Sequence, residues 1–403
     1  MKTEGDDSIK SYNNLYEKVF TDENIILALK NAAKNKRKNN KRHKRLRYAY
    51  AHTEEFVPKV KQWILDFEPK IHKKFIINDG VSAKKREIIV PTEKEVIVHH
   101  AVINVLKPII CKGMYEHSYA SIPGRGTHKV IKRVSRWIYN DHANTKYCLQ
   151  MDVKKFFDSI PQDKLLARLR KLIRDDKYYE LVRKIIVTAE SGIPLGFTTS
   201  QWFANWYLTP LDHKIKEEWG AKYYIRYMDD MVIFGSNKRK LHKIRKRVEQ
   251  YLNDVLGLKL KENWQVFFMD STSYKKKKGH FLDFLGFKFY RNHIGLRSKI
   301  ALKAQRKAKH IFKKGKANIC DARQIVTYAG LIKNANCHKW YRDHIGKYVC
   351  LRYMRKKIAR HDRLEAYKRN GKWGKKKWRK RYKKRTIAKS RKKHDTQNNT
   401  KGG

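Results

Sequence analysis

Acidic residues are scarce in this chain. It has 38 Asp and Glu against 96 Lys and Arg in 403 residues, which gives a formal net charge of +58. Such an excess indicates a polyanionic partner, and nucleic acid is the commonest one. A ribosome-associated protein and a chain that binds anions without specificity are the alternatives. Hydrophobic residues make up 41% of the chain, so we expect a globular protein with a substantial core.

Cysteines and long apolar runs are also few. The five cysteines lie far apart and form no Cys-x-x-Cys pair, which indicates a cytoplasmic protein without disulfides. A zinc site from Cys337, His344 and Cys350 is disfavoured, because their spacing matches no common zinc finger. No run reaches about 18 apolar residues, and the first residues lack the apolar core of a signal peptide. We therefore expect no membrane partner.

Two adjacent aspartates, Asp229 and Asp230, stand between the apolar runs of "YIRYMDDMVIFG". Charged residues are seldom buried without partners, so this pair either forms a polar hairpin turn or holds something strongly positive. A third carboxylate, Asp152, lies at the end of the strand-like run 147–153. If the two strands are neighbours in one sheet, three carboxylates converge and need a counter-charge. Two Mg²⁺ ions, with Mn²⁺ as a substitute, would supply it and leave positions for substrate phosphates.

The other motifs, in their order along the chain, resemble those of a reverse transcriptase from about residue 50 to about residue 350. "LQMDVKKFFDSI" and "YMDD" look like the two metal-binding motifs, and "IPLGFTTSQ" between them looks like the substrate-positioning loop and helix. "HFLDFLGFKF" resembles the primer grip. "KKREIIVP" and "HSYASIPGRGTHKVI" resemble fingers motifs of prokaryotic reverse transcriptases.

The resemblance implies roles for individual residues. The implied metal ligands and catalytic residues are Asp152, the backbone carbonyl of Val153, Asp229 and Asp230. The implied residues for the incoming deoxynucleotide are Lys84, Arg86, Phe157, Leu195, Gly196, Ser200 and Gln201. The implied residues for template and primer are Gly124, Arg125, Tyr227, Leu285 and Gly286. Lys261 or Lys259 is the candidate general acid on the leaving pyrophosphate.

Several of these roles have a plainer alternative. Lys84 and Arg86 would be solvated cations in so basic a chain. Phe157, placed to exclude a ribose hydroxyl, would only pack in the core. Tyr227 would be an ordinary strand aromatic, and the pair at 285–286 would belong to a buried strand.

The form of "LGFTTSQ" narrows the resemblance. Leu195 precedes Gly196 and Gln201 follows Ser200, as in the reverse transcriptases of diversity-generating retroelements. This group, which is prokaryotic or phage-encoded, copies a template-repeat RNA into cDNA with errors at adenines, and the cDNA diversifies a target gene. Its members work with a small basic accessory protein that is an oligomer. We hypothesise that Leu195 contributes to the errors, because its side chain cannot make the hydrogen bond that an amide would make there.

The resemblance predicts an α+β right-hand polymerase fold with a helical thumb and an antiparallel sheet in the palm. The expected segments are a basic N-terminal helical segment (1–50), fingers (51–145), palm (146–290), thumb (291–350) and a basic extension (351–403). The extension holds 23 Lys and Arg against three acidic residues, interleaved with Trp373 and Trp378. Such a composition suits RNA binding through phosphate attraction and base stacking, with a soluble tail that has no binding site as the alternative.

Three rival functions stay open. The first is another prokaryotic reverse transcriptase, from a retron, a defence system or a group II intron. The second is an RNA-binding protein with a polymerase fold and no activity, which the presence of all three aspartates disfavours. The third, an RNA-dependent RNA polymerase, is disfavoured by Phe157.

Overall fold

The computed structural model describes residues 10–34, 41–70, 74–78, 85–269 and 279–369. These residues form two compact units. The first comprises the described residues up to Leu285 together with Phe289–Asn292, and the second comprises Gly286–Lys288 and the described residues from His293 onward. None of the described helices is long and apolar enough to cross a membrane.

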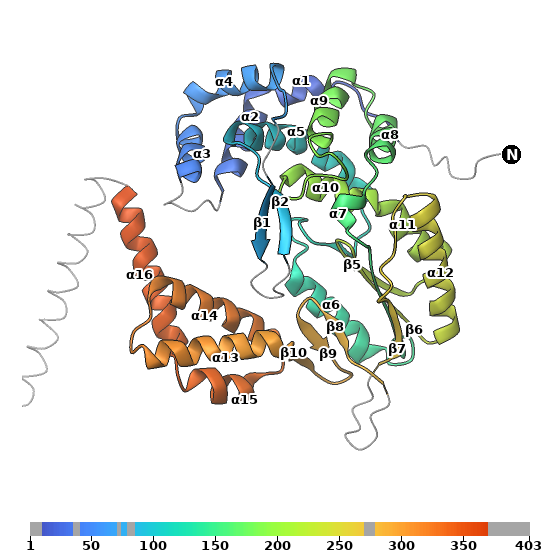
Figure 1. The fold of residues 1–403 in the computed structure, drawn as a ribbon, viewed down its shortest axis with the longest axis vertical. Coiled ribbons are helices and arrows are strands. Elements are labelled where there is room, and N and C mark those ends of the chain that lie inside the picture. Colours follow the sequence, from blue (N-terminus) through green and yellow to red (C-terminus); the bar gives the residue numbers. More distant parts are fainter. Residues whose placement is uncertain (1–9, 35–40, 71–73, 79–84, 270–278, 370–403) are drawn as a thin grey trace, which may run out of the picture. The chain divides into compact units, whose positions relative to one another are not determined.

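The N-terminal part of the first unit is a group of helices around a buried central one (Figure 1). The central helix, α5 (Glu93–Lys112), begins at a capping box in which Thr92 and Glu95 bond each other's backbone N–H groups. The helices near it are α1 (Leu15–Val19), α2 (Asp22–Ala33), α3 (Lys41–Ala51), α4 (Thr53–Leu65) and α9 (Asp176–Ile186). Asn24 on α2 donates to the Ala101 carbonyl of α5 at 3.0 Å. The helices before residue 50 therefore share the core of those that follow, and no structural boundary separates them.

A five-stranded sheet follows, in the order β3-β5-β6-β4-β7. Its strands are β3 (Ser118–Tyr119), β4 (Tyr147–Asp152), β5 (Tyr223–Tyr227), β6 (Asp230–Gly235) and β7 (Gln265–Phe268). β3 runs parallel to β5, and the other neighbours are antiparallel. Met231 to Phe234 on β6 are all buried, so both faces of this strand are covered.

The other elements of the first unit are helices and one pair of strands outside this sheet. α12 (Lys238–Asp254) lies along it with an apolar face of Leu241, Ile244, Val248 and Leu252 (Figure 1). The other helices of the unit are α6 (Thr127–Asn140), α7 (Phe156–Ser159), α8 (Gln162–Leu172), α10 (Thr198–Tyr207), α11 (Thr209–His213) and the π-helical η1 (Lys214–Glu218). β1 (Lys74–Asn78) and β2 (Lys85–Ile89) form a separate antiparallel hairpin.

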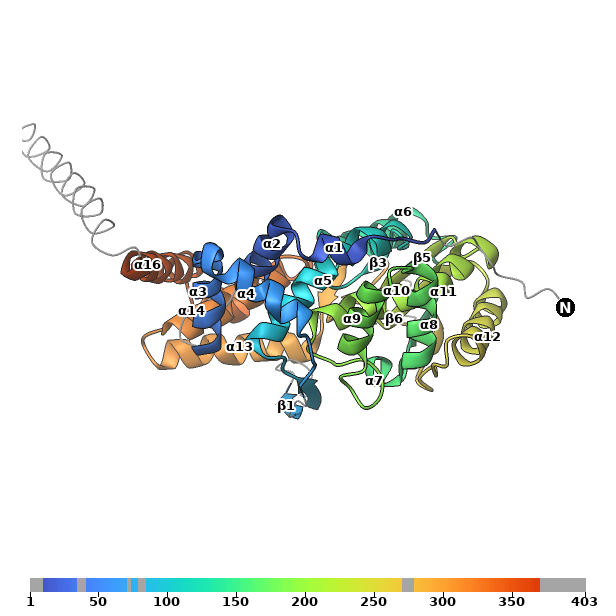
Figure 2. The same cartoon turned by 90° about the horizontal axis from the view of Figure 1, so that it is seen from above.

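Three short strands come next along the chain, before the last helices. β8 (Leu282–Phe284), β9 (Phe287–Phe289) and β10 (Ile294–Leu296) form a sheet in the order β10-β9-β8. The helices after them are α13 (Ser298–Lys313), α14 (Ile319–Ile332), α15 (His338–Tyr341), η2 (Arg342–Gly346) and α16 (Leu351–Arg369) (Figures 1 and 2).

The last described helix, α16, packs on α14. Met354 is buried, and Arg323 on α14 pairs with Asp362 on α16 at 2.8 Å. The sequence places a boundary at residue 350, but α16 continues the helical unit beyond it. Trp373 and Trp378 lie outside the described residues, and the RNA-binding role of the extension stays a prediction.

Candidate active site

Two of the three aspartates face each other across neighbouring strands. β4 and β6 pair antiparallel, and Asp152 is the direct partner of Asp230. Side chains of such direct partners lie on the same face of the sheet, with Cβ atoms about 4.5–5.5 Å apart. The sequence analysis required these two strands to be neighbours in one sheet for the carboxylates to converge, and β4 and β6 are neighbours.

Asp229 lies in the tight turn that joins β5 to β6. Tyr227 pairs with Asp230, so the loop has only two residues, Met228 and Asp229. Met228 has φ +60°, a conformation that glycine usually supplies at the first position of such hairpins. Strained backbone of this kind persists only where the surroundings impose it, and it gathers at functional sites. The polar hairpin turn that the sequence offered as one alternative is therefore present, next to a third carboxylate.

Asp152 is held by the segment that runs beside it. The Lys261 N–H donates to the Asp152 carbonyl at 2.8 Å, and the Lys261 ammonium pairs with Asp152 Oδ2. Val153 forms an isolated bridge with Leu260. Lys259 contributes only its carbonyl, which accepts from the Lys154 N–H at 2.8 Å, and its side chain is exposed. Of the two candidate general acids, Lys261 is the one whose side chain contacts Asp152.

The second oxygen of Asp152 fits a cation. Oδ1 is buried and has no hydrogen-bond partner, an arrangement that is costly unless something binds there. As the side chains lie, no group of three or more His, Cys, Asp or Glu among the described residues is arranged to hold a metal ion. Asp152 presents only Oδ1, because Lys261 occupies Oδ2. The magnesium ions stay a prediction that this buried oxygen supports.

The loop before α10 lies against the end of β2. The Ile89 N–H donates to the Leu195 carbonyl at 2.8 Å. Gly196 has φ +117°, and a Cβ there would lie 2.2 Å from the Ile89 carbonyl oxygen, so only glycine fits. Phe157 on α7 joins the same neighbourhood, because its carbonyl accepts from the Ile193 N–H at 2.8 Å. Three of the residues predicted for the nucleotide thus come from adjoining segments.

The other residues predicted to bind the incoming deoxynucleotide are less closely grouped. Arg86 is exposed on β2, opposite Ile77. Ser200 is buried in the first turn of α10, whereas Gln201 beside it is exposed. Lys84 lies outside the described residues.

The residues predicted for the template have structural partners. Arg125 Nη1 donates to the Tyr115 carbonyl at 2.8 Å and to the Ser118 carbonyl at 3.5 Å, so its guanidinium supports the start of β3. Gly124, next to it, has φ +75°. The Tyr227 hydroxyl lies 3.4 Å from Oγ1 of Thr127, the first residue of α6, so the segment that follows Arg125 adjoins the hairpin of Asp229. A phosphate contact by Arg125 stays a prediction.

Leu285 and Gly286 form a turn rather than part of a strand. They connect β8 to β9 with φ +53° and +87°, the pattern of a two-residue type I′ hairpin. The alternative of a buried strand is therefore wrong at these positions. Gln150 Nε2 donates to the Asp283 carbonyl at 3.0 Å and ties β8 to the strand that carries Asp152.

Residues 71–289, more than half of the chain, match the model of the family described as "Reverse transcriptase (RNA-dependent DNA polymerase)". The chain belongs to the reverse transcriptase family. The α+β right-hand polymerase fold expected from the sequence is thereby confirmed.

Curated relatives of this chain come from several element types. It is 28% identical over 138 residues to the retron Ec73 reverse transcriptase of Escherichia coli, covering 31% of this chain and 42% of that protein. It is 26% identical over 172 residues to the group II intron-encoded protein LtrA of Lactococcus lactis subsp. cremoris, covering 40% and 28%. It is 30% identical over 151 residues to an uncharacterized 91 kDa protein in a cob intron of Schizosaccharomyces pombe, covering 35% and 18%. The aligned segments span less than half of each relative.

Solved telomerase structures are more distant. A Candida albicans telomerase in complex with a fragment of telomeric RNA has a TM-score of 0.44 and 13% identity, covering 79% of this chain and 65% of that one. An apo Candida tropicalis telomerase has a TM-score of 0.43 and 14% identity, covering 60% of each chain.

Two features of this chain are not predicted from the sequence. The first is Arg226, a fully buried residue on β5 that pairs with Asp212. The sequence indicates the burial of Arg226 only through a cation at an inward-facing strand position. In a chain with so many cations this pattern is not distinctive.

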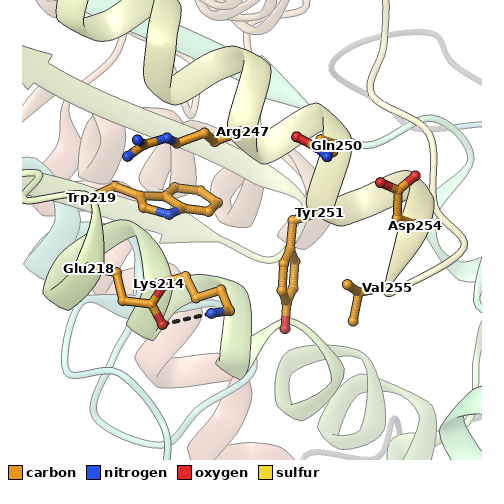
Figure 3. Close-up of a pocket in the computed structure, with 8 residues that line it drawn as sticks. All are labelled: Lys214, Glu218, Trp219, Arg247, Gln250, Tyr251, Asp254 and Val255. Atoms are coloured by element: carbon orange, nitrogen blue, oxygen red, sulfur yellow. Dashed lines mark hydrogen bonds and ion pairs between the residues drawn. The ribbon is translucent and has the colours of Figure 1, made fainter. Parts of the chain in front are cut away.

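The second feature is a cleft of about 280 Å³ between η1 and α12 (Figure 3). In it the rings of Trp219 and Tyr251 meet edge to face with centroids 6.5 Å apart, and Arg247 extends beside the indole. Lys214 Nζ donates to Glu218 Oε1 at 2.6 Å. No motif marks the cleft, because its residues come from two separate helices.

Proposed function

We propose that this protein is an RNA-directed DNA polymerase that extends a primer on an RNA template by two-metal nucleotidyl transfer. One observation carries the proposal: Asp152 and Asp230 are direct partners across β4 and β6, and a buried Asp152 oxygen has no protein partner. Asp229 adjoins them in the turn. Carboxylate oxygens at a sheet edge are the ligands that Mg²⁺ prefers.

Each role in the reaction falls to a residue near this edge. Asp152, the Val153 carbonyl, Asp229 and Asp230 would hold two Mg²⁺ ions, which supply activation of the attacking hydroxyl and charge neutralisation on the phosphates. Lys261 holds a proton for the leaving pyrophosphate. Phe157 lies under the sugar and excludes a ribose hydroxyl, while Arg86 binds the triphosphate.

The finer proposal is that the enzyme belongs to a diversity-generating retroelement and copies a template-repeat RNA with errors at adenines. It is supported by Leu195 before Gly196 and by Gln201 after Ser200. Template RNA, a cDNA primer and a small basic oligomeric accessory protein are the proposed partners, in the cytoplasm of a prokaryote. The similarity to the retron Ec73 enzyme and to LtrA supports the second candidate, a retron or group II intron enzyme without this mutagenic role.

Primer extension on an RNA template tests the polymerase. Wild type should add deoxynucleotides in Mg²⁺ or Mn²⁺, Asp229→Ala should add none, and the control Asp176→Asn, on the exposed face of α9, should match wild type. Equal extension by Asp229→Ala and wild type would refute the two-metal centre. A folded wild type without activity would favour the silent RNA-binding protein.

Sequencing of the cDNA tests the finer proposal. Errors concentrated at template adenines support the retroelement. Errors spread evenly over the four template bases would support the retron or group II candidate instead.

A further inference from the structure

Arg226 is one of the largest side chains that this protein buries completely. It lies on β5, two residues before Met228. Its guanidinium forms a two-point ion pair with Asp212 on α11: Nε donates to Oδ1 at 2.7 Å and Nη2 to Oδ2 at 2.5 Å. Both side chains are fully excluded from solvent. Taking two charges out of water costs several kcal/mol per ion, so such a pair is weak evidence for stability alone.

The other donors of Arg226 reach the aspartate hairpin and its neighbours. Nη1 donates to the Met228 carbonyl at 2.9 Å and to Asn205 Oδ1 at 3.3 Å. Nη2 donates to Ser118 Oγ at 3.0 Å and to the Asn205 carbonyl at 3.1 Å. One planar group therefore joins β3, α10, α11 and the turn that carries Asp229.

Asp212 is satisfied just as fully. Beyond Arg226 it accepts from the Tyr224 hydroxyl at 2.6 Å and from Ser118 Oγ at 2.9 Å. Burial opposes the charge of Arg226, but Asp212 beside it raises the pKa of the guanidinium above its usual value. Burial also lowers the pKa of the nearby His117 to about 4, so that ring brings no second positive charge at neutral pH.

We propose that Arg226 is a positioning residue for catalysis: it holds Met228 in its strained conformation and so fixes Asp229 and Asp230 opposite Asp152. The Met228 N–H is bonded as well, to the Tyr119 carbonyl at 3.3 Å, so both polar backbone groups of this residue are anchored. Surroundings that impose a strained turn are what such a turn requires. Through Asn205 the same guanidinium also connects the turn to α10, which follows the loop of Leu195 and Gly196. The inference rests on the proposed function.

Only arginine has the geometry for this task. Its planar fork makes the two bonds to Asp212 and still has donors for Met228 and Asn205, whereas a lysine ammonium is a compact point charge. Arg226→Lys therefore keeps the charge beside Asp212 and loses the anchor on the turn.

A comparison of two arginines tests the inference. Arg168→Lys is the control, because Arg168 is a half-buried arginine away from the aspartates that donates to the Tyr207 carbonyl at 2.7 Å and lies over the Trp206 ring. Both variants are measured below their unfolding transitions for three quantities: kcat and KM for deoxynucleotide, and the affinity for Mn²⁺ by electron paramagnetic resonance. We expect Arg226→Lys to lower kcat by about 10- to 100-fold, with KM close to wild type and weaker Mn²⁺ binding. Arg168→Lys should change only the thermal midpoint.

Other outcomes overturn the inference. Wild-type kcat and Mn²⁺ affinity in Arg226→Lys, or equal losses in both variants, would reduce Arg226 to a structural residue. If Arg226→Lys does not fold, Ser118→Ala replaces it: this change removes one bond to Arg226 and one to Asp212, and it should lower kcat about threefold. Unchanged kcat in Ser118→Ala would then overturn the inference. A wild type that binds Mn²⁺ but does not polymerise would refute the proposed function instead, and the Mn²⁺ measurement would still judge the positioning role.

Discussion

Two regions of this protein are each built around an aspartate, and they differ in how completely hydrogen bonds satisfy the oxygens of that aspartate. Asp212 accepts hydrogen bonds from Arg226, Tyr224 and Ser118, and both of its oxygens have partners. Asp152 pairs with Lys261 through one oxygen and keeps a buried second oxygen without a partner. The side chain of Asp152 is 24% exposed, and that of Asp212 is 0% exposed.

The difference separates a carboxylate that holds the fold from one that is available for chemistry. A buried polar network is stabilising only when every member is satisfied, and the Asp212 region meets that condition. An incompletely satisfied carboxylate at a strand end costs stability, and proteins retain that cost where a ligand binds. The two regions are joined through Met228, whose carbonyl accepts from Arg226 and whose successor is Asp229.

Exchange of Asp212 for asparagine should mainly lower stability, whereas the same exchange at Asp152 should mainly lower activity. Asp212→Asn leaves the Arg226 guanidinium buried without its counter-charge, and the free energy of unfolding should fall by about 3–5 kcal/mol. Asp152→Asn removes only a partly exposed ion pair, so stability should change by less than about 1 kcal/mol. Primer extension by Asp152→Asn should nevertheless fall about a thousandfold, as expected when several kcal/mol of charge stabilisation are lost. Denaturant unfolding with primer extension measures both; similar stability losses in the two variants would break the comparison.

The Asp152 region also contains Lys261, the proposed general acid, and the Asp212 region has no such role. Lys261→Met should lower the rate of a single nucleotide addition about 100-fold, the usual contribution of a general acid. Lys259→Met is the control, because that side chain is exposed and only its backbone is bonded. Rapid-quench measurement of one incorporation step decides between them. A larger loss in Lys259→Met would assign the proton to the other lysine.

A substitution at Gly196 tests whether binding of the deoxynucleotide depends on the contact between the loop before α10 and Ile89 on β2. In Gly196→Ala the new Cβ meets the Ile89 carbonyl at 2.2 Å, so the loop or β2 must shift, and KM for deoxynucleotide should rise about tenfold, or about 1.4 kcal/mol. Gly315→Ala is the matched control, since Gly315 has φ +67° with nothing within 4 Å. Each variant should lose about 1–2 kcal/mol of stability from backbone strain. A normal KM in Gly196→Ala would show that substrate binding does not use this contact.

The sequence predicts the neighbouring positions of Asp152 and Asp230 better than the contacts that support them. Their strands and the turn follow from local patterns that coincide with recognisable motifs. The pairing of Arg226 with Asp212 depends on tertiary contacts between β5 and α11, and no local pattern encodes it. The boundary expected at residue 350 follows a change in composition, but Met354 still buries an apolar side chain in α16. At Leu285 and Gly286 the plainer alternative to a primer contact, a buried strand, is wrong because both residues have positive φ angles.

The smallest expected effect concerns fidelity at Leu195. Its carbonyl accepts from the Ile89 N–H, so a change of side chain leaves that backbone bond in place. Leu195→Gln should add one hydrogen bond near the incoming nucleotide, worth about 1 kcal/mol, and lower misincorporation at template adenines about fivefold. Leu195→Met, which keeps an apolar side chain of similar volume, should leave the errors at adenines as in wild type. Sequenced cDNA from one RNA template measures all three enzymes. If Leu195→Gln and Leu195→Met give the same error spectrum, the errors arise from a residue other than Leu195.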